Sequence, residues 1–172
     1  MLRRLAQTIL VVAFAGSSHA QDQRPVRAPR EFIELRGMWL LDETAGKGHI
    51  AGLTVAQTLT ISTTPVEISV VKDGKPPEVY RVDGTEVAAQ DARTGATLDI
   101  RYGFTLVAGM VALTSRRTRG DFTNIVTDAY AASGDTLTIE RQLSVVANPQ
   151  RNLVTLSDER NNRQSLVYRR RK

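Results

Sequence analysis

Residues 133–140 read SGDTLTIE, a turn followed by the start of a strand. Its first three residues are the small and polar types that reverse a chain in a tight hairpin. From Leu137 to Leu143 apolar and polar residues alternate, which is the period of a strand with one buried face. The stretch therefore predicts an antiparallel hairpin.

The same alternation recurs along most of the chain, at residues 33–41, 57–62, 66–70, 80–82, 98–102 and 166–168. Asp73-Gly74 and Asp83-Gly84 add further turn signals. Residues 87–93 and 122–132 show no clear period. No stretch keeps a helical period for more than two turns, so the crossover helices of a parallel sheet are not predicted. We expect an all-β fold of about eight to ten strands, either a closed up-and-down barrel or a sandwich.

Gly37 and Trp39 form a G-x-W motif in the first predicted strand. The motif resembles the one that opens the first strand of lipocalins and other calycins. This resemblance implies that Trp39 closes one end of a barrel beneath an arginine from the last strand. Arg170 is expected to be that arginine because it shares a predicted face with Tyr168, and Arg169 replaces it if a bulge shifts the period.

Three further segments follow the G-x-W motif in order: QTLTI at 57–61, YRVDG at 80–84 and SGDTLTI at 133–139. This order resembles small exported bacterial proteins with a lipocalin-like barrel, and the resemblance covers most of residues 34–170. It implies an antiparallel up-and-down β-barrel of lipocalin-like architecture.

The N-terminus resembles an export signal, with Arg3 and Arg4 before an uncharged run and small residues at Ser18 and Ala20. The alternative, a membrane anchor, needs about 20 mostly apolar residues, which the run does not supply. We expect residues 1–20 to be a cleaved signal peptide, 21–30 a flexible leader and 31–172 the barrel domain. The mature protein would then be periplasmic or secreted.

Composition removes several classes of site. The chain has 0 cysteines, which excludes thiolate metal sites, a cysteine nucleophile, disulfides and a lipid-anchoring cysteine. Loss of Arg3 and Arg4 leaves 21 of the 23 basic residues against 18 acidic ones, so the net charge falls from +5 to a mild +3.

No catalytic residue, metal site or cofactor is predicted. After signal removal His49 is the only histidine, so a Ser-His-Asp triad would have to use it as the base. It lies in a glycine-rich loop that follows the first strand, where it either contacts a ligand at the barrel mouth or is simply solvated. Asp42 and Glu43 are adjacent on a strand end and point to opposite sides, which does not favour a cation site.

The basic groups at residues 116–119 and 169–172 are interpreted as solvated faces. Nucleic acid is not an expected partner, because no aromatic residues lie between the arginines to stack with bases. Arg119-Gly120-Asp121 is interpreted as a turn. Membrane insertion as a barrel is also not expected, because the outward positions include Glu67, Arg101 and Glu140.

Arg141 is the charge that points to a pocket, because it shares the inward alternation of Ile139. A buried arginine needs a partner, either an acid such as Asp128 or a bound anion, unless a bulge turns it to solvent. If the barrel is hollow, the predicted lining has Arg141 as its polar group and, as its other members, Leu59, Ile61, Ile68, Tyr80, Ile100, Tyr102 and Ile139.

Three functions stay open. The first is binding of a small lipophilic molecule, which an eight-stranded barrel is just wide enough to hold. The second is a structural or interaction protein whose barrel is filled by its own side chains. The third is a metal-independent hydrolase or isomerase. Whether the interior of the barrel is hollow, holds paired titratable groups or is packed distinguishes these three functions. The sequence does not indicate an oligomeric state.

Overall fold

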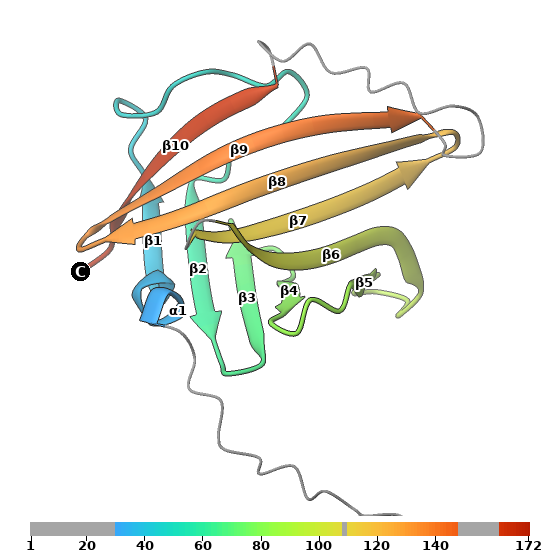
Figure 1. The fold of residues 1–172 in the computed structure, drawn as a ribbon, viewed down its shortest axis with the longest axis horizontal. Coiled ribbons are helices and arrows are strands. Elements are labelled where there is room, and N and C mark those ends of the chain that lie inside the picture. The colour runs from blue at the N-terminus through green and yellow to red at the C-terminus, as the bar shows by residue number, and fades with distance from the viewer. Residues whose placement is uncertain (1–29, 108–109, 148–161) are drawn as a thin grey trace, which may run out of the picture.

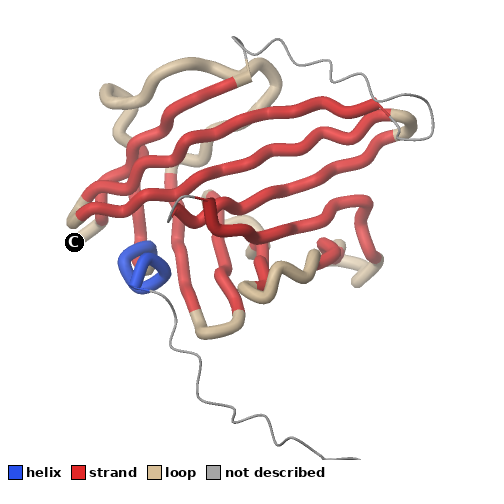
Figure 2. Tube along the Cα trace, in the orientation of Figure 1, coloured by secondary structure: helices blue, strands red, loops and turns tan. Residues whose placement is uncertain are grey.

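The computed structural model describes residues 30–107, 110–147 and 162–172, and their strands form one antiparallel sheet (Figures 1 and 2). The strands are β1 (Gly37–Leu41), β2 (Thr58–Thr63), β3 (Glu67–Lys72), β4 (Glu78–Arg81), β5 (Val87–Gln90), β6 (Thr97–Val107), β7 (Met110–Arg119), β8 (Phe122–Ser133), β9 (Thr136–Ala147) and β10 (Arg163–Arg170).

The sheet order is β4-β3-β2-β1-β10-β9-β8-β7-β6-β5. Strands that follow each other in sequence pair with each other, except β4 with β5, and β1 also pairs with β10, which is the connectivity of an up-and-down barrel. The barrel is nearly closed. It is not fully closed because β4 and β5, the two end strands of the sheet, do not pair with each other. The predicted lipocalin-like all-β fold is confirmed, and the sandwich alternative is wrong.

The predicted turns join antiparallel neighbours. The turn at residues 133–135 connects β8 to β9 and the turn at 119–121 connects β7 to β8. Gly134 and Gly120 have φ of 58° and 57°, a left-handed conformation that glycine adopts without steric cost. The two stretches without a clear period are also strands, since 87–90 is the edge strand β5 and 122–133 is β8.

The prediction of a strand across residues 33–41 is wrong at its beginning. Residues 30–35 form the short helix α1 (Arg30–Leu35), and β1 begins only at Gly37. On the helix, Phe32 and Leu35 are three residues apart and share one face, which is buried, whereas Ile33 is 53% exposed. The helix therefore buries both large apolar residues, whereas a strand would point them to opposite sides.

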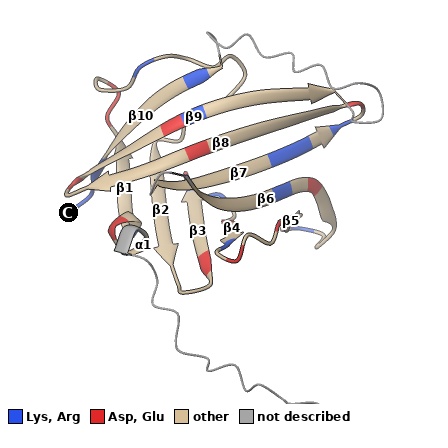
Figure 3. Cartoon of the chain, in the orientation of Figure 1, with Lys and Arg blue, Asp and Glu red and all other residues tan. Residues whose placement is uncertain are grey.

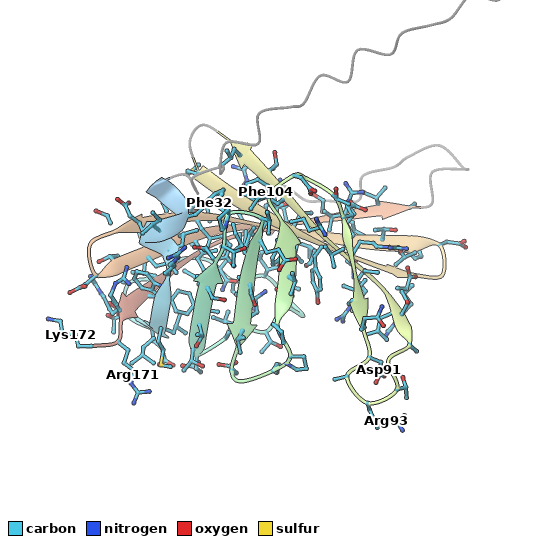
Figure 4. The ribbon with its side chains drawn as sticks, turned by 90° about the horizontal axis from the view of Figure 1, so that it is seen from below. Phe32, Asp91, Arg93, Phe104, Arg171 and Lys172 are labelled. Carbon is cyan, nitrogen blue, oxygen red and sulfur yellow. The ribbon has the colours of Figure 1, made fainter. Side chains whose placement is uncertain are left out.

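α1 covers one end of the barrel. Phe32 is fully buried and contacts Phe104 edge to face, with 5.6 Å between ring centroids (Figure 4). The hydroxyl of Thr63, at the end of β2, donates a hydrogen bond to the Phe32 carbonyl at 3.2 Å. Side chains from most strands fill the interior above the helix, including Leu59, Ile61, Ile68, Val70, Tyr80, Leu113, Tyr130, Leu137, Ile139 and Tyr168. This end of the barrel is a packed core.

Trp39 and Arg170 lie opposite each other on β1 and β10, and the guanidinium carbon of Arg170 is 4.2 Å from the centroid of the buried indole. Arg170 also donates hydrogen bonds to the carbonyls of Glu34 and Arg36, at 2.9 and 2.6 Å. A Cβ on Gly37 would lie 2.7 Å from Arg170 Nη1, so glycine is required for this approach. Gly37, Trp39 and Arg170, which the resemblance to the G-x-W motif of calycins brings together, thus meet at the end of the barrel that α1 covers.

Arg169, the alternative partner of Trp39, lies on the other face of β10. It forms an exposed ion pair with Asp42, with 3.1 Å between Nε and Oδ2. The period of the last strand is therefore unshifted.

Candidate functional site

A cavity of about 390 Å³ lies inside the barrel, away from α1. α1 packs where β2 ends, at Thr63, whereas the cavity lies at the far end of β3, at Lys72. Its apolar lining includes Leu53 and Ala56 from the loop before β2, Pro76 from the loop before β4, Ile100 from β6 and Val126 from β8. The barrel is therefore filled at one end and hollow at the other.

Arg141 points into the barrel and marks the border between the two halves. Its Nε and Nη2 donate hydrogen bonds to the two carboxylate oxygens of Asp128, at 2.7 and 2.9 Å. Both side chains are buried, and Asp128 is the residue directly opposite on β8. Burial lowers the pKa of Arg141, but the hydrogen bonds and charge of Asp128 outweigh that effect and raise it. The guanidinium is therefore a fixed positive charge.

Arg141 also lines the cavity. Among the residues that the structure describes, its third nitrogen, Nη1, has one hydrogen-bond partner, the Thr54 carbonyl at 3.5 Å. Asp128 thus neutralises most of the charge of Arg141, as predicted for an ion pair between these two residues. The Nη1 group of Arg141 still faces the loop before β2.

Besides the pair of Arg141 and Asp128, the cavity wall carries a second set of interacting polar side chains, with Glu78 at its centre. Its Oε2 accepts a hydrogen bond from the Tyr80 hydroxyl at 2.8 Å and lies 2.7 Å from Lys72 Nζ. The rings of Tyr80 and Tyr102 are 5.3 Å apart, and burial raises the pKa of both hydroxyls. Glu78 is therefore already engaged by a cation and a phenol.

Two further cations on the lining, Lys75 and Arg117, form no side-chain ion pair with any residue the structure describes. Arg117 lies on β7 opposite Ile100 on one side and Asn124 on the other, both of which also line the cavity. Figure 3 shows this basic stretch of β7 beside the one on β6. Both side chains are exposed, so water solvates their charges, and an anion that enters the cavity can replace that water.

The structure places the predicted site residues in three different settings. Arg141, Tyr102 and Ile100 line the cavity. Tyr80 and Ile139, which the prediction counts as lining, lie in the packed core with 2% and 1% of their surface exposed. The same holds for Leu59, Ile61 and Ile68.

His49 is exposed on the loop between β1 and β2, outside the cavity lining. The loop is attached to β10 by a bridge between Lys47 and Ser165. Gly48 approaches that strand closely, since a Cβ there would lie 2.8 Å from the Arg163 carbonyl. Gly46 and Gly48 of this loop thus allow it to pack against β10.

Lys72, Lys75, Glu78 and Arg117 are cavity residues that the sequence prediction missed. Arg117 had a detectable signal, because it shares the alternation of Leu113 and Ser115, whose side chains face inward. The interpretation of residues 116–119 as a solvated face agrees with the exposure of Arg117, but it did not predict that this side chain also lines the cavity. The prediction is correct for Arg116, which points outward and pairs with Glu86 at 3.1 Å.

A second hollow, of about 970 Å³, lies between the unpaired strands β4 and β5. Five residues line both it and the interior cavity: Lys75, Pro76, Glu78, Ile100 and Tyr102. The two hollows are therefore adjacent parts of one site.

Within the described residues, no group of three or more His, Asp or Glu side chains is placed to hold a metal ion. No helix in that part of the chain is long and apolar enough to cross a membrane.

No family model and no curated protein matches the sequence. Among solved structures, a secretary abundant heat soluble (SAHS) protein from Ramazzottius varieornatus is similar, with 12% sequence identity and a TM-score of 0.48. The match covers 80% of this chain and 96% of that chain.

Proposed function

We propose that this protein is a binding module for a small amphipathic anion, which it holds in the hollow end of the barrel. One observation carries the proposal: Lys75 and Arg117 are cations without an ion-pair partner among the described residues, and they line the same cavity as Ile100 and Val126. A volume of about 390 Å³ is within the usual range of ligand sites.

The charges on the lining favour an anion over a cation. Lys72 and Arg141 are matched by Glu78 and Asp128, and the Asp73 carboxylate accepts a hydrogen bond from the Thr58 amide at 2.8 Å. Lys75, Arg117 and the Asp73 carboxylate then remain without an ion pair among the described residues, so two positive charges stand against one negative charge. A guanidinium binds a carboxylate, sulfonate or phosphate through charge-assisted hydrogen bonds, which are about twice as strong as neutral ones.

The apolar lining favours a ligand that also carries a hydrocarbon or aromatic part. Leu53, Ile100 and Val126 would take that part out of water, while the charged group stays near Arg117. Asn124 and Ser115, also on the lining, can donate hydrogen bonds to the head group.

The test compares three ligands with the same chain and different heads: dodecanoate, dodecanol and dodecyltrimethylammonium. A ligand that binds only the folded protein raises its stability, by about 2.7 kcal/mol at one hundred times Kd. We expect dodecanoate to raise the unfolding midpoint most, dodecanol less and the ammonium compound not at all. Equal effects of all three would mean that the cations do not select the ligand, and no effect of any would contradict binding.

We also propose that the protein acts outside the cytoplasm, as its basic and then uncharged N-terminus predicts. Residues 1–29 lie outside the described part of the chain. Intact-mass analysis of the protein from its native cell tests this proposal. We expect a mature chain that begins at Gln21, and a chain that keeps Arg3 and Arg4 would contradict it.

A further inference from the structure

The wall of the barrel is open at one place. Every other neighbouring pair of strands forms a hydrogen-bonded ladder, but β4 and β5 do not. Figure 4 shows the turn after β5, marked by Asp91 and Arg93, standing apart from β4. We call this gap and the hollow of about 970 Å³ along it the seam groove.

One end of the barrel is covered, and the other end is covered only in part, since Lys75, Arg117 and Asn124 on the cavity lining are exposed. α1 covers one end, with Phe32 fully buried. At the other end, the loop before β2 lies over the cavity and is held there by two inward side chains. Tyr168 donates a hydrogen bond to the Ala56 carbonyl at 2.9 Å, and Arg141 donates one to Thr54 at 3.5 Å. A ligand too long for the interior cavity can extend into the seam groove, because the cavity and the groove share Lys75, Pro76, Glu78, Ile100 and Tyr102 as lining residues.

The lining of the seam groove suits an apolar chain. The side chains on its two sides include Pro76, Pro77, Val79, Val87, Ala88, Ala89, Ala92 and Leu98. Leu98 is 37% exposed, although it lies on the inward alternation with Ile100 and Tyr102. Apolar surface of this kind gains free energy when a hydrocarbon covers it.

The groove also carries charged residues, three carboxylates against two cations: Glu67, Glu78, Asp91, Lys75 and Arg93. Arg117 and Arg141 line the interior cavity and not the groove, whereas Val79, Val87 and Ala88 line the groove and not the cavity. This arrangement orients an amphipathic anion with its head inside the barrel and its tail outside.

We propose that the ligand is a chain-like anion, such as a long-chain carboxylate, and that its chain leaves the barrel through the seam and lies in the seam groove. This inference rests on the proposed function, and it adds the shape of the ligand and the path of its chain. A carboxylate with a short chain would bind in the interior cavity alone.

The experiment bridges the seam. The natural chain has no cysteine, so the pair Val79→Cys and Ala88→Cys gives unique attachment points on β4 and β5 for a short bis-maleimide. The matched control is Ser69→Cys with Val79→Cys, which bridges the paired strands β3 and β4 and leaves the seam open. Affinities for hexanoate and dodecanoate are measured by calorimetry before and after bridging.

We expect bridging of the seam to weaken dodecanoate binding roughly tenfold or more, and to leave hexanoate binding and the control protein unchanged. Ala88→Trp, which narrows the groove without a bridge, should act in the same direction. Equal dodecanoate affinity in the open, bridged and Ala88→Trp proteins would overturn the seam proposal alone. Failure of the unmodified protein to bind either acid would overturn the proposed function as well.

Discussion

Arg141 and Asp128 lie directly opposite each other on β9 and β8, and two hydrogen bonds of 2.7 and 2.9 Å join the guanidinium to the carboxylate inside the barrel. Below the pair Ile139 and Tyr130, also opposite each other, belong to the packed core. Above it Val126 lines the cavity. The ion pair therefore divides a filled half from a hollow half.

Removing one member of this pair should destabilise the protein strongly, because the other charge then stays buried without a partner. We expect Asp128→Ala to lower the free energy of unfolding by about 3 to 5 kcal/mol. The double variant Asp128→Leu with Arg141→Met should lose much less, since an apolar pair replaces both charges. Urea denaturation measures these values. If the double variant loses as much as the sum of the single variants Asp128→Leu and Arg141→Met, the pair is not coupled.

Trp39 should be the main stabilising residue of the closed end. Its indole is fully buried and its Nε1 donates a hydrogen bond to the Leu35 carbonyl at 2.9 Å. We expect Trp39→Ala to cost about 3 to 5 kcal/mol and Arg170→Ala to cost less. Because the two side chains touch, a double-mutant cycle should give a coupling energy of about 0.5 kcal/mol or more. Strictly additive costs would show that the stacked geometry contributes nothing.

The four tyrosines of the chain should titrate late in the folded protein. Burial is the first cause in each case: it raises the pKa of Tyr168 to about 12, and the pKa values of Tyr80, Tyr102 and Tyr130 are also raised. Unfolded tyrosine has a pKa of about 10. Folding therefore favours the neutral phenols, and this contribution to stability is complete below pH 10 and is lost as the pH rises toward 12 and beyond.

Tyrosinate absorbance during an alkaline titration checks this prediction. We expect little signal at pH 10 and a steep rise together with loss of the native circular dichroism. A full tyrosine equivalent that ionises at or below pH 10 in the folded protein would be inconsistent with the buried positions described above.

Most of the fold could be predicted from alternation and turns, since 136–143 and the turns at 119–121 and 133–135 are local signals. The short helix could not, because six residues are too few to show a helical period and Phe32 and Leu35 are buried only by contact with the barrel end. The open seam could not be predicted either. Alternation shows which face of a strand is buried, but not which edge lacks a partner.

The cavity itself is what obscured the pattern of residues 122–132. Asn124 and Asp128 occupy inward positions there, opposite Arg117 and Leu113 on β7, so the expected polar and apolar faces are mixed. Arg117 mixes the faces of β7 in the same way, because it is a charged residue on the alternation of Leu113 and Ser115. Positions where sequence reasoning fails locally are often functional, and here they gather around one cavity.

The most direct test of the central claim, that the hollow half of the barrel binds an anion, is a calorimetric titration of dodecanoate into three proteins. Arg117→Gln removes a cation from the cavity lining, and Arg101→Gln removes one from the outward face of the neighbouring strand β6. We predict that Arg117→Gln weakens binding about tenfold or more with an unchanged unfolding midpoint, and that Arg101→Gln binds like the natural protein. Equal affinities of all three proteins, or equal losses in both variants, would contradict the claim.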